Sequence, residues 1–154
     1  MSTKPSYLGL LNAVSNGETH AARYFNAWLK LTTDPEVRAV VRVVANREAE
    51  HALAFEKRLI ELGYALIERP DPAADEKLAY LSDPARTDLD RLLHLGYGEP
   101  REDPFGGFFD DHTIDPQTGA LLGRYVAEER DTIRRLRALT ETLKARAAGA
   151  QKAA

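Results

Sequence analysis

Apolar residues recur every three or four positions along three long stretches of this chain, which predicts an all-α protein. In residues 7–32 the repeat runs through Leu8, Leu11, Phe25 and Leu29. This spacing places apolar side chains on one face of a helix. We therefore expect a first long helix that buries one face.

The second stretch carries clear boundary residues. Asp34 followed by Pro35 is typical of a helix N-cap and first turn, and Gly63 is typical of a left-handed C-cap. The apolar stripe between them consists of Val37, Val41, Val44, Phe55, Leu59 and Leu62. A helix of this length can span a four-helix bundle.

The middle of the chain is less regular. Pro70 and Pro72 indicate a connector over residues 68–74, and weaker helical patterns follow in 75–81 and 84–95. The third helix is therefore expected to be short or broken.

A long loop is expected over residues 97–119, where glycine, proline and aspartate are too dense for a regular helix. Loops of this length in compact domains are commonly functional or packed against a partner. Phe105, Phe108 and Phe109 indicate that this loop is anchored. The acidic run at 110–115, which includes His112, offers cation ligands, but an aspartate-rich turn before a helix is the commoner explanation.

The last helix is expected to begin at Pro116 or Thr118 and to end at Ala147. Residues 149–154 are expected to form a flexible tail. Residues 1–148 then form a single domain, an antiparallel four-helix bundle with a short or broken third helix and a long loop before helix four. The chain has 154 residues, of which 44% are hydrophobic, and this is enough for one buried core.

Composition narrows the function classes. The formal net charge of -3 gives no polycationic surface for nucleic acid or anionic membranes. No apolar run long enough for a membrane helix or signal peptide exists, so a cytoplasmic protein is expected. The chain has no cysteine, so a metal would be held by oxygen and imidazole ligands, which favours iron, manganese or zinc.

Three carboxylates interrupt the apolar stripes of three different helices. These are Glu18, Glu48 and Glu129, and His51 stands three residues after Glu48 on the same helix face. An isolated buried carboxylate costs several kcal/mol unless it is protonated, paired or bound to metal. A shared cation would explain all three. The alternatives are a surface pair of Glu48 with His51, and Glu129 paired with an arginine such as Arg130.

The segments that carry these residues resemble a known family. They are Glu18 with Ala21 and Tyr24, the runs at 45–52 and 55–59, and the runs at 127–130 and 133–136. They are similar to helices one, two and four of the rubrerythrin-like branch of the ferritin-like family. The resemblance implies a ferritin-like four-helix bundle with a dinuclear iron or manganese centre that reacts with oxygen or peroxide.

The chain departs from the family pattern at several positions. Thr132 stands where the second histidine would be, so one or two metal ions remain possible. Glu128 competes with Glu129 as a ligand, because a small helix rotation exchanges them. Asp88 is the candidate carboxylate from helix three. Without cysteines the chain lacks the family's rubredoxin-like module, so a redox reaction would need an external electron donor.

Three functions follow as expectations, and no catalytic residue or substrate is assigned. The first is a metal-dependent oxidoreductase that oxidises ferrous iron or reduces peroxide or oxygen. The second is a metal-poor dimeric bundle that serves as a structural or binding module. The third is an oxygenase whose long aromatic loop shapes a substrate pocket. A homodimer is expected in solution, because a broken third helix leaves apolar surface to cover.

Overall fold

The computed structural model describes residues 3–153, and this part of the chain is helical without strands, which confirms the all-α class. The long helices are α1 (Leu8–Leu31), α2 (Pro35–Glu61) and α5 (Pro116–Ala153). The short ones are α3 (Pro72–Leu81), α4 (Asp88–His94) and the 3-10 helix η1 (Gly106–Phe109).

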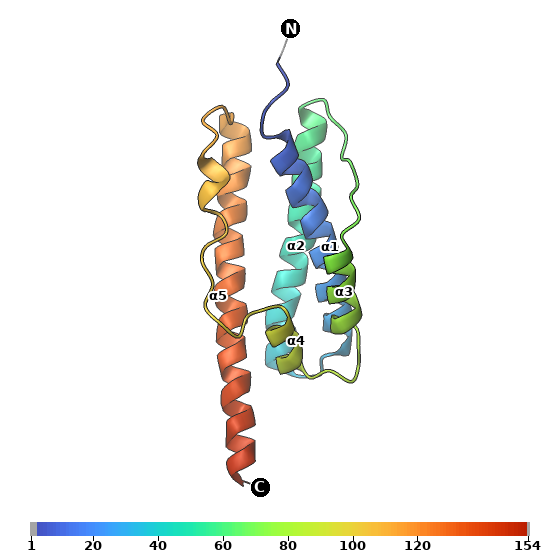
Figure 1. The fold of residues 1–154 in the computed structure, drawn as a ribbon, viewed down its shortest axis with the longest axis vertical. Coiled ribbons are helices and arrows are strands. Elements are labelled where there is room, and N and C mark those ends of the chain that lie inside the picture. Colours follow the sequence, from blue (N-terminus) through green and yellow to red (C-terminus); the bar gives the residue numbers. More distant parts are fainter. Residues whose placement is uncertain (1–2, 154) are drawn as a thin grey trace.

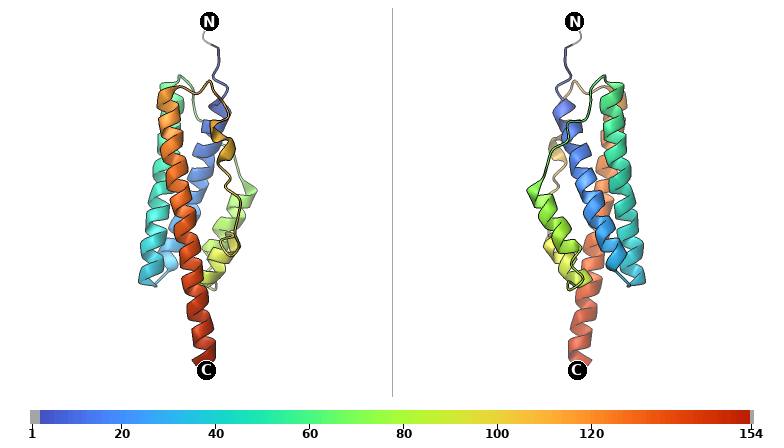
Figure 2. Two further views of the ribbon diagram at one scale, coloured as in Figure 1. Left: turned by 90° about the vertical axis from the view of Figure 1, so that its left-hand side faces the viewer. Right: turned by 90° about the vertical axis from the view of Figure 1, so that its right-hand side faces the viewer.

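The three long helices lie side by side (Figure 1). α1 and α2 form an antiparallel hairpin, and α5 packs beside α2 and runs in the same direction as α1. α3 packs on α1, while α4 contacts α5 at the end of the bundle where α1 ends. From α4 the chain crosses to α5 and returns along it through η1 as a mostly irregular segment (Figures 1 and 2). The broken third helix and the long loop are confirmed, whereas no fourth long helix lies within residues 3–153.

Caps fix both ends of α2 and the start of α5. Asp34 accepts bonds from the backbone N–H groups of Glu36 and Val37, as expected for an N-cap. Gly63 has φ of +86°, the left-handed conformation expected after α2. Asp115 accepts a bond from the backbone N–H of Thr118 at 3.0 Å and so caps α5. The acidic turn before α5 is therefore a helix-capping turn.

The end of α5 corrects the sequence prediction. The helix passes Ala147 and Gly149 and continues to Ala153, beyond the ends of the other helices (Figure 2). A glycine inside a helix costs only about 1 kcal/mol relative to alanine, and its neighbours here are mainly good helix formers. None of the helices in residues 3–153 has the length and apolar character that crossing a membrane requires.

The buried apolar side chains form two clusters. One contains Trp28, Val41 and Leu136, and the other contains Leu11, Phe55 and Leu122. On the long helices the two clusters are separated by about two turns in α1 and by nearly three in α2 and α5. The polar residues of the candidate site fall in this interval, so apolar layers enclose them on two sides.

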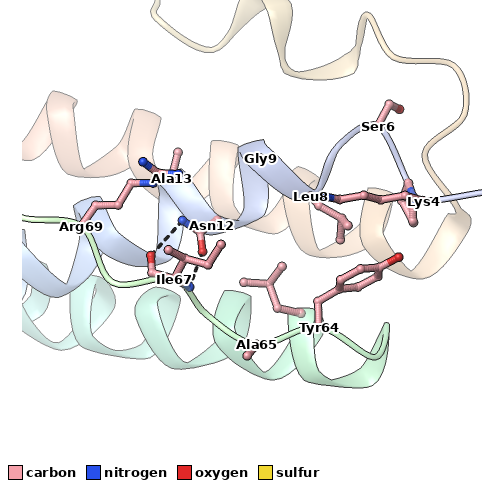
Figure 3. A pocket seen from close by; sticks show the side chains of 12 residues that line it. Lys4, Ser6, Leu8, Gly9, Asn12, Ala13, Tyr64, Ala65, Ile67 and Arg69 are labelled. Atoms are coloured by element: carbon pink, nitrogen blue, oxygen red, sulfur yellow. Dashed lines mark hydrogen bonds between the residues drawn. The ribbon is translucent and has the colours of Figure 1, made fainter.

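The connector after α2 is held against α1 by side-chain amides (Figure 3). Asn12 accepts a bond from the backbone N–H of Ile67 at 2.8 Å and donates one to its carbonyl at 3.1 Å. A hollow of about 360 Å³ lies here, and Lys4 and Arg69 are its charged residues. Its lining contains no carboxylate and no imidazole.

Candidate metal centre

α1, α2 and α5 each bring one ligand atom to the same point. His51 Nδ1 lies 3.4 Å from Glu18 Oε2 and 3.4 Å from Glu129 Oε1. The three atoms all lie within 4.8 Å of one another. The inward orientation of Glu18 and His51 is confirmed, since they are only 7% and 3% exposed.

These same three atoms lack hydrogen-bond partners. Glu18 Oε2, His51 Nδ1 and Glu129 Oε1 are buried, and the 3.4 Å contacts of His51 Nδ1 with the two oxygens lack hydrogen-bond geometry. A buried polar atom without a partner costs about 1–3 kcal/mol, and more when it is charged. Three such atoms that converge from three helices fit a cation at their common centre, and carboxylate oxygen with imidazole nitrogen is a donor set that iron, manganese and zinc accept.

The outer nitrogen of His51 has a partner of its own. His51 Nε2 lies 2.6 Å from Glu128 Oε2, and Arg124 Nε donates to the other oxygen of Glu128 at 3.0 Å. A carboxylate on the far nitrogen places the proton there and leaves the near nitrogen free to bind metal. Glu129 is thus the carboxylate that joins the cluster, and Glu128 orients the histidine.

Glu48 lies beside the cluster and is only 3% exposed. Burial and the neighbouring carboxylate of Glu18 raise the pKa of Glu48 well above its usual range. The expectation that Glu48 is buried is confirmed. Its oxygens are not among the three convergent atoms, so Glu48 is an additional carboxylate rather than the anchor of the cluster.

His51, Glu18 and Glu129 shift the pKa values of one another. Burial would lower the pKa of His51, but the neighbouring carboxylates of Glu129, Glu18 and Glu128 outweigh it and raise this pKa to about 10. Burial would raise the pKa of Glu18, yet His51 and its other bonds lower it overall. For Glu129 burial prevails over the attraction of His51, and the pKa is raised. Metal-free, the centre is a protonated imidazole among carboxyls.

Three tyrosines surround the centre. Tyr125 donates its hydroxyl proton to Glu18 Oε1 at 2.9 Å, and its ring meets the His51 ring edge-on. Burial, followed by the charge of a site glutamate, raises the pKa of Tyr24, Tyr97 and Tyr125. All three therefore stay protonated and can donate hydrogen bonds. Tyr97 comes from the long loop, and no spacing pattern in the sequence connects it to the helices.

The guanidinium of Arg47 lies beside Thr132, the position where the family pattern has its second histidine. Thr132 is buried, and its hydroxyl accepts a bond from Arg47 Nη1 at 3.3 Å. Arg47 also forms an ion pair of 2.8 Å with Asp131. The guanidinium charge opposes the rise in the pKa of both Glu48 and Glu129. It therefore supplies positive charge near these carboxylates.

Asp88 lies apart from the centre. Its carboxylate accepts bonds from Trp28 Nε1 at 2.6 Å and from the Thr32 hydroxyl at 2.8 Å. Trp28 follows Glu18 by ten residues of α1, which is about 15 Å along the helix axis. The structure thus gives Asp88 a structural role that holds α4 against the end of α1.

Comparisons with protein-family models, with curated proteins and with solved structures found no match for this chain.

Proposed function

We propose that this chain is a ferritin-like metal protein that holds one iron or manganese ion between Glu18, His51 and Glu129, with Glu48 as a fourth carboxylate. The convergence of three buried ligand atoms that have no hydrogen bond carries the proposal. A single ion is favoured because Thr132 cannot replace the second histidine and Arg47 already brings a positive charge to that side. Zinc fits the same donors.

The chemistry proposed is the oxidation of ferrous iron by peroxide or oxygen. Carboxylate donors stabilise ferric over ferrous iron, so an acid-rich site makes ferrous iron a better reductant. With peroxide, the ferrous ions of two chains would supply the two electrons, and two protons would complete the two water molecules formed. Tyr125 keeps Glu18 oriented, and Glu128 keeps the inner nitrogen of His51 unprotonated when metal binds.

Ferrous iron binding under anaerobic conditions tests the proposal. We expect the wild-type protein to bind about one ion per chain and to show a new absorbance when oxygen or peroxide is admitted. Glu18→Gln and Glu129→Gln should weaken binding by at least about tenfold, because each removes a charged ligand. Glu50→Gln, at an exposed glutamate of α2, is the control. Equal binding by all four proteins would refute the site.

The alternative function is that of a metal-poor dimeric bundle that serves as a structural or binding module, and one observation favours it. Protonated His51, with its pKa raised to about 10, can neutralise neighbouring carboxylates without a metal. Elemental analysis after expression in iron- and manganese-rich medium decides between the two. Less than about a tenth of an ion per chain supports the alternative. Sedimentation measures the dimer separately.

A further inference from the structure

A second cavity lies on the loop side of α5, next to the proposed centre. Its volume is about 630 Å³, which suits a small organic molecule. The wall from α5 includes Glu129, Ile133 and Arg137, and the wall from the long loop includes Tyr97 and Phe105. The irregular return of the chain along α5 therefore creates this space.

The α5 wall connects the cavity to the centre. Glu129, Ile133 and Arg137 are four residues apart and so stand on one stripe of the helix, about 12 Å long. Glu129 sends Oε1 into the ligand cluster and also lines the cavity. A molecule in the cavity would thus touch a metal ligand at one end and Arg137 at the other.

Two of the arginines around this cavity pair with carboxylates. Arg130 Nε donates to Asp103 Oδ2 at 3.0 Å. Arg134 pairs with Asp131. Both guanidiniums therefore have a carboxylate partner, although Asp131 is shared with Arg47 and Arg135.

Arg101 is bound to the backbone. Its Nη2 donates to the carbonyl of Leu95 at 3.1 Å, and its guanidinium lies directly against Gly96. Gly96 has φ of +83°, and a Cβ there would lie 1.5 Å from Arg101 Nη2. Glycine is therefore required both by the backbone conformation and by the space that Arg101 fills. This arginine fastens the loop to the end of α4.

Arg137 differs from the other three. Its Nε is buried and has no hydrogen-bond partner, and its Nη2 has only a long bond of 3.5 Å to the carbonyl of Arg101. Within residues 3–153 no carboxylate lies at ion-pair distance from it. A partly buried guanidinium without a counter-ion is costly, and an anion bound to the nitrogens of Arg137 that face the cavity would balance its charge.

We propose that this cavity binds a small organic carboxylate with an apolar body, held through Arg137, and places it against the Glu129 side of the centre. The guanidinium fork matches a carboxylate, and Phe105 with Ile133 offers apolar contact beside it. That this compound lies beside a metal ion rests on the proposed function. Its binding to the cavity does not require the metal.

Calorimetric titration of the full-length, metal-free protein with benzoate tests the binding. We expect benzoate to bind saturably to the wild-type protein. The affinity should be at least about tenfold lower for benzamide, which lacks the charge, and for inorganic phosphate, which lacks the apolar body. The affinity for benzoate should fall as much in Arg137→Gln, which lacks the guanidinium. Arg135→Gln, at an exposed arginine of α5 outside the cavity, should bind benzoate as the wild type does. Magnetisation transfer from the benzoate ring to the Ile133 methyl groups should locate the ligand.

Several outcomes would overturn the proposal. They are no saturable benzoate binding up to about 10 mM, equal binding of benzoate and benzamide, or equal binding by the two arginine variants. If Arg137→Gln does not fold, the benzamide comparison in the wild-type protein decides. A manganese titration of the same preparation tests the centre separately. Benzoate binding without manganese binding would refute only the metal site, and the reverse would refute only the cavity.

Discussion

Replacing Glu48 by glutamine should stabilise the metal-free protein while it weakens metal binding. Burial and the charge of Glu18 raise the pKa of Glu48 well above its usual value of 4.5, so folding at neutral pH forces this group to take up a proton or to bear a buried charge. Glutamine has nearly the same shape and no charge. It removes this cost and also removes a carboxylate that metal would use.

The size of the effect has a ceiling set by pH. Between pH 4.5 and pH 7 lie 2.5 pH units, and each unit corresponds to about 1.4 kcal/mol, so the cost at pH 7 is at most about 3.5 kcal/mol. Because the pKa is raised on folding, the stability of the wild type is greatest below the unfolded pKa and is lost as pH rises toward the folded pKa. We expect Glu48→Gln to gain about 1–3 kcal/mol at pH 7 and clearly less at pH 5.5.

Urea unfolding of metal-free protein at both pH values measures the difference. Glu56→Gln, at a partly exposed glutamate two turns along α2, is the matched control and should change stability by less than about 0.5 kcal/mol. Added manganese should then stabilise the wild type more than Glu48→Gln, since only a bound ion shifts the folding equilibrium. A gain that is equal at pH 7 and pH 5.5, or a loss at pH 7, would show that the charge of Glu48 is not the cause.

Three further predictions concern the centre and its surroundings. Metal affinity should rise between pH 6 and pH 8, because His51, whose pKa is raised to about 10, must lose its proton to bind; calorimetry in buffers of different ionisation enthalpy would count the protons released. Asp88→Ala should cost about 2 kcal/mol of unfolding free energy, since it leaves the fully buried Trp28 without its acceptor, and should leave manganese affinity unchanged. Thr132→His should not add a second metal ion unless Arg47 is also replaced by glutamine, because the guanidinium lies against that position; elemental analysis of the single and double variants checks this.

The helices and the cluster could be predicted because both follow from local rules. The apolar stripe repeats at helical spacing, and an acid within such a stripe points inward with its neighbours. Glu18, His51 and Glu129 come together for this reason. The choice between Glu128 and Glu129 could not be made from sequence. Adjacent residues differ by about 100° around a helix, and only packing against α2 fixes the rotation.

The cavity and the role of Arg137 could not be predicted from the sequence, for a different reason. Arg137 is one of many arginines on a polar helix face, and nothing in its local sequence marks it. It differs because Arg130 and Arg134 pair with carboxylates and Arg101 donates to the Leu95 carbonyl at 3.1 Å, while Arg137 has a buried Nε without a partner and only a long bond of 3.5 Å. Such differences depend on the path of the loop in space. Loop paths have no periodic pattern from which they could be read.

The position of the charges explains how one site can be stable without metal and still be suited to bind it. Between two apolar layers, the metal-free centre holds Glu18, Glu48 and Glu129 against protonated His51 and the nearby guanidinium of Arg47. A raised pKa at Glu48 and at His51 means that protons supply part of the compensation. A divalent ion would replace these protons rather than add to them, so its binding should be proton-coupled. Arg47 stays beside the carboxylates with and without metal. One divalent ion together with this guanidinium therefore balances most of the carboxylate charge, and little negative charge is left for a second ion.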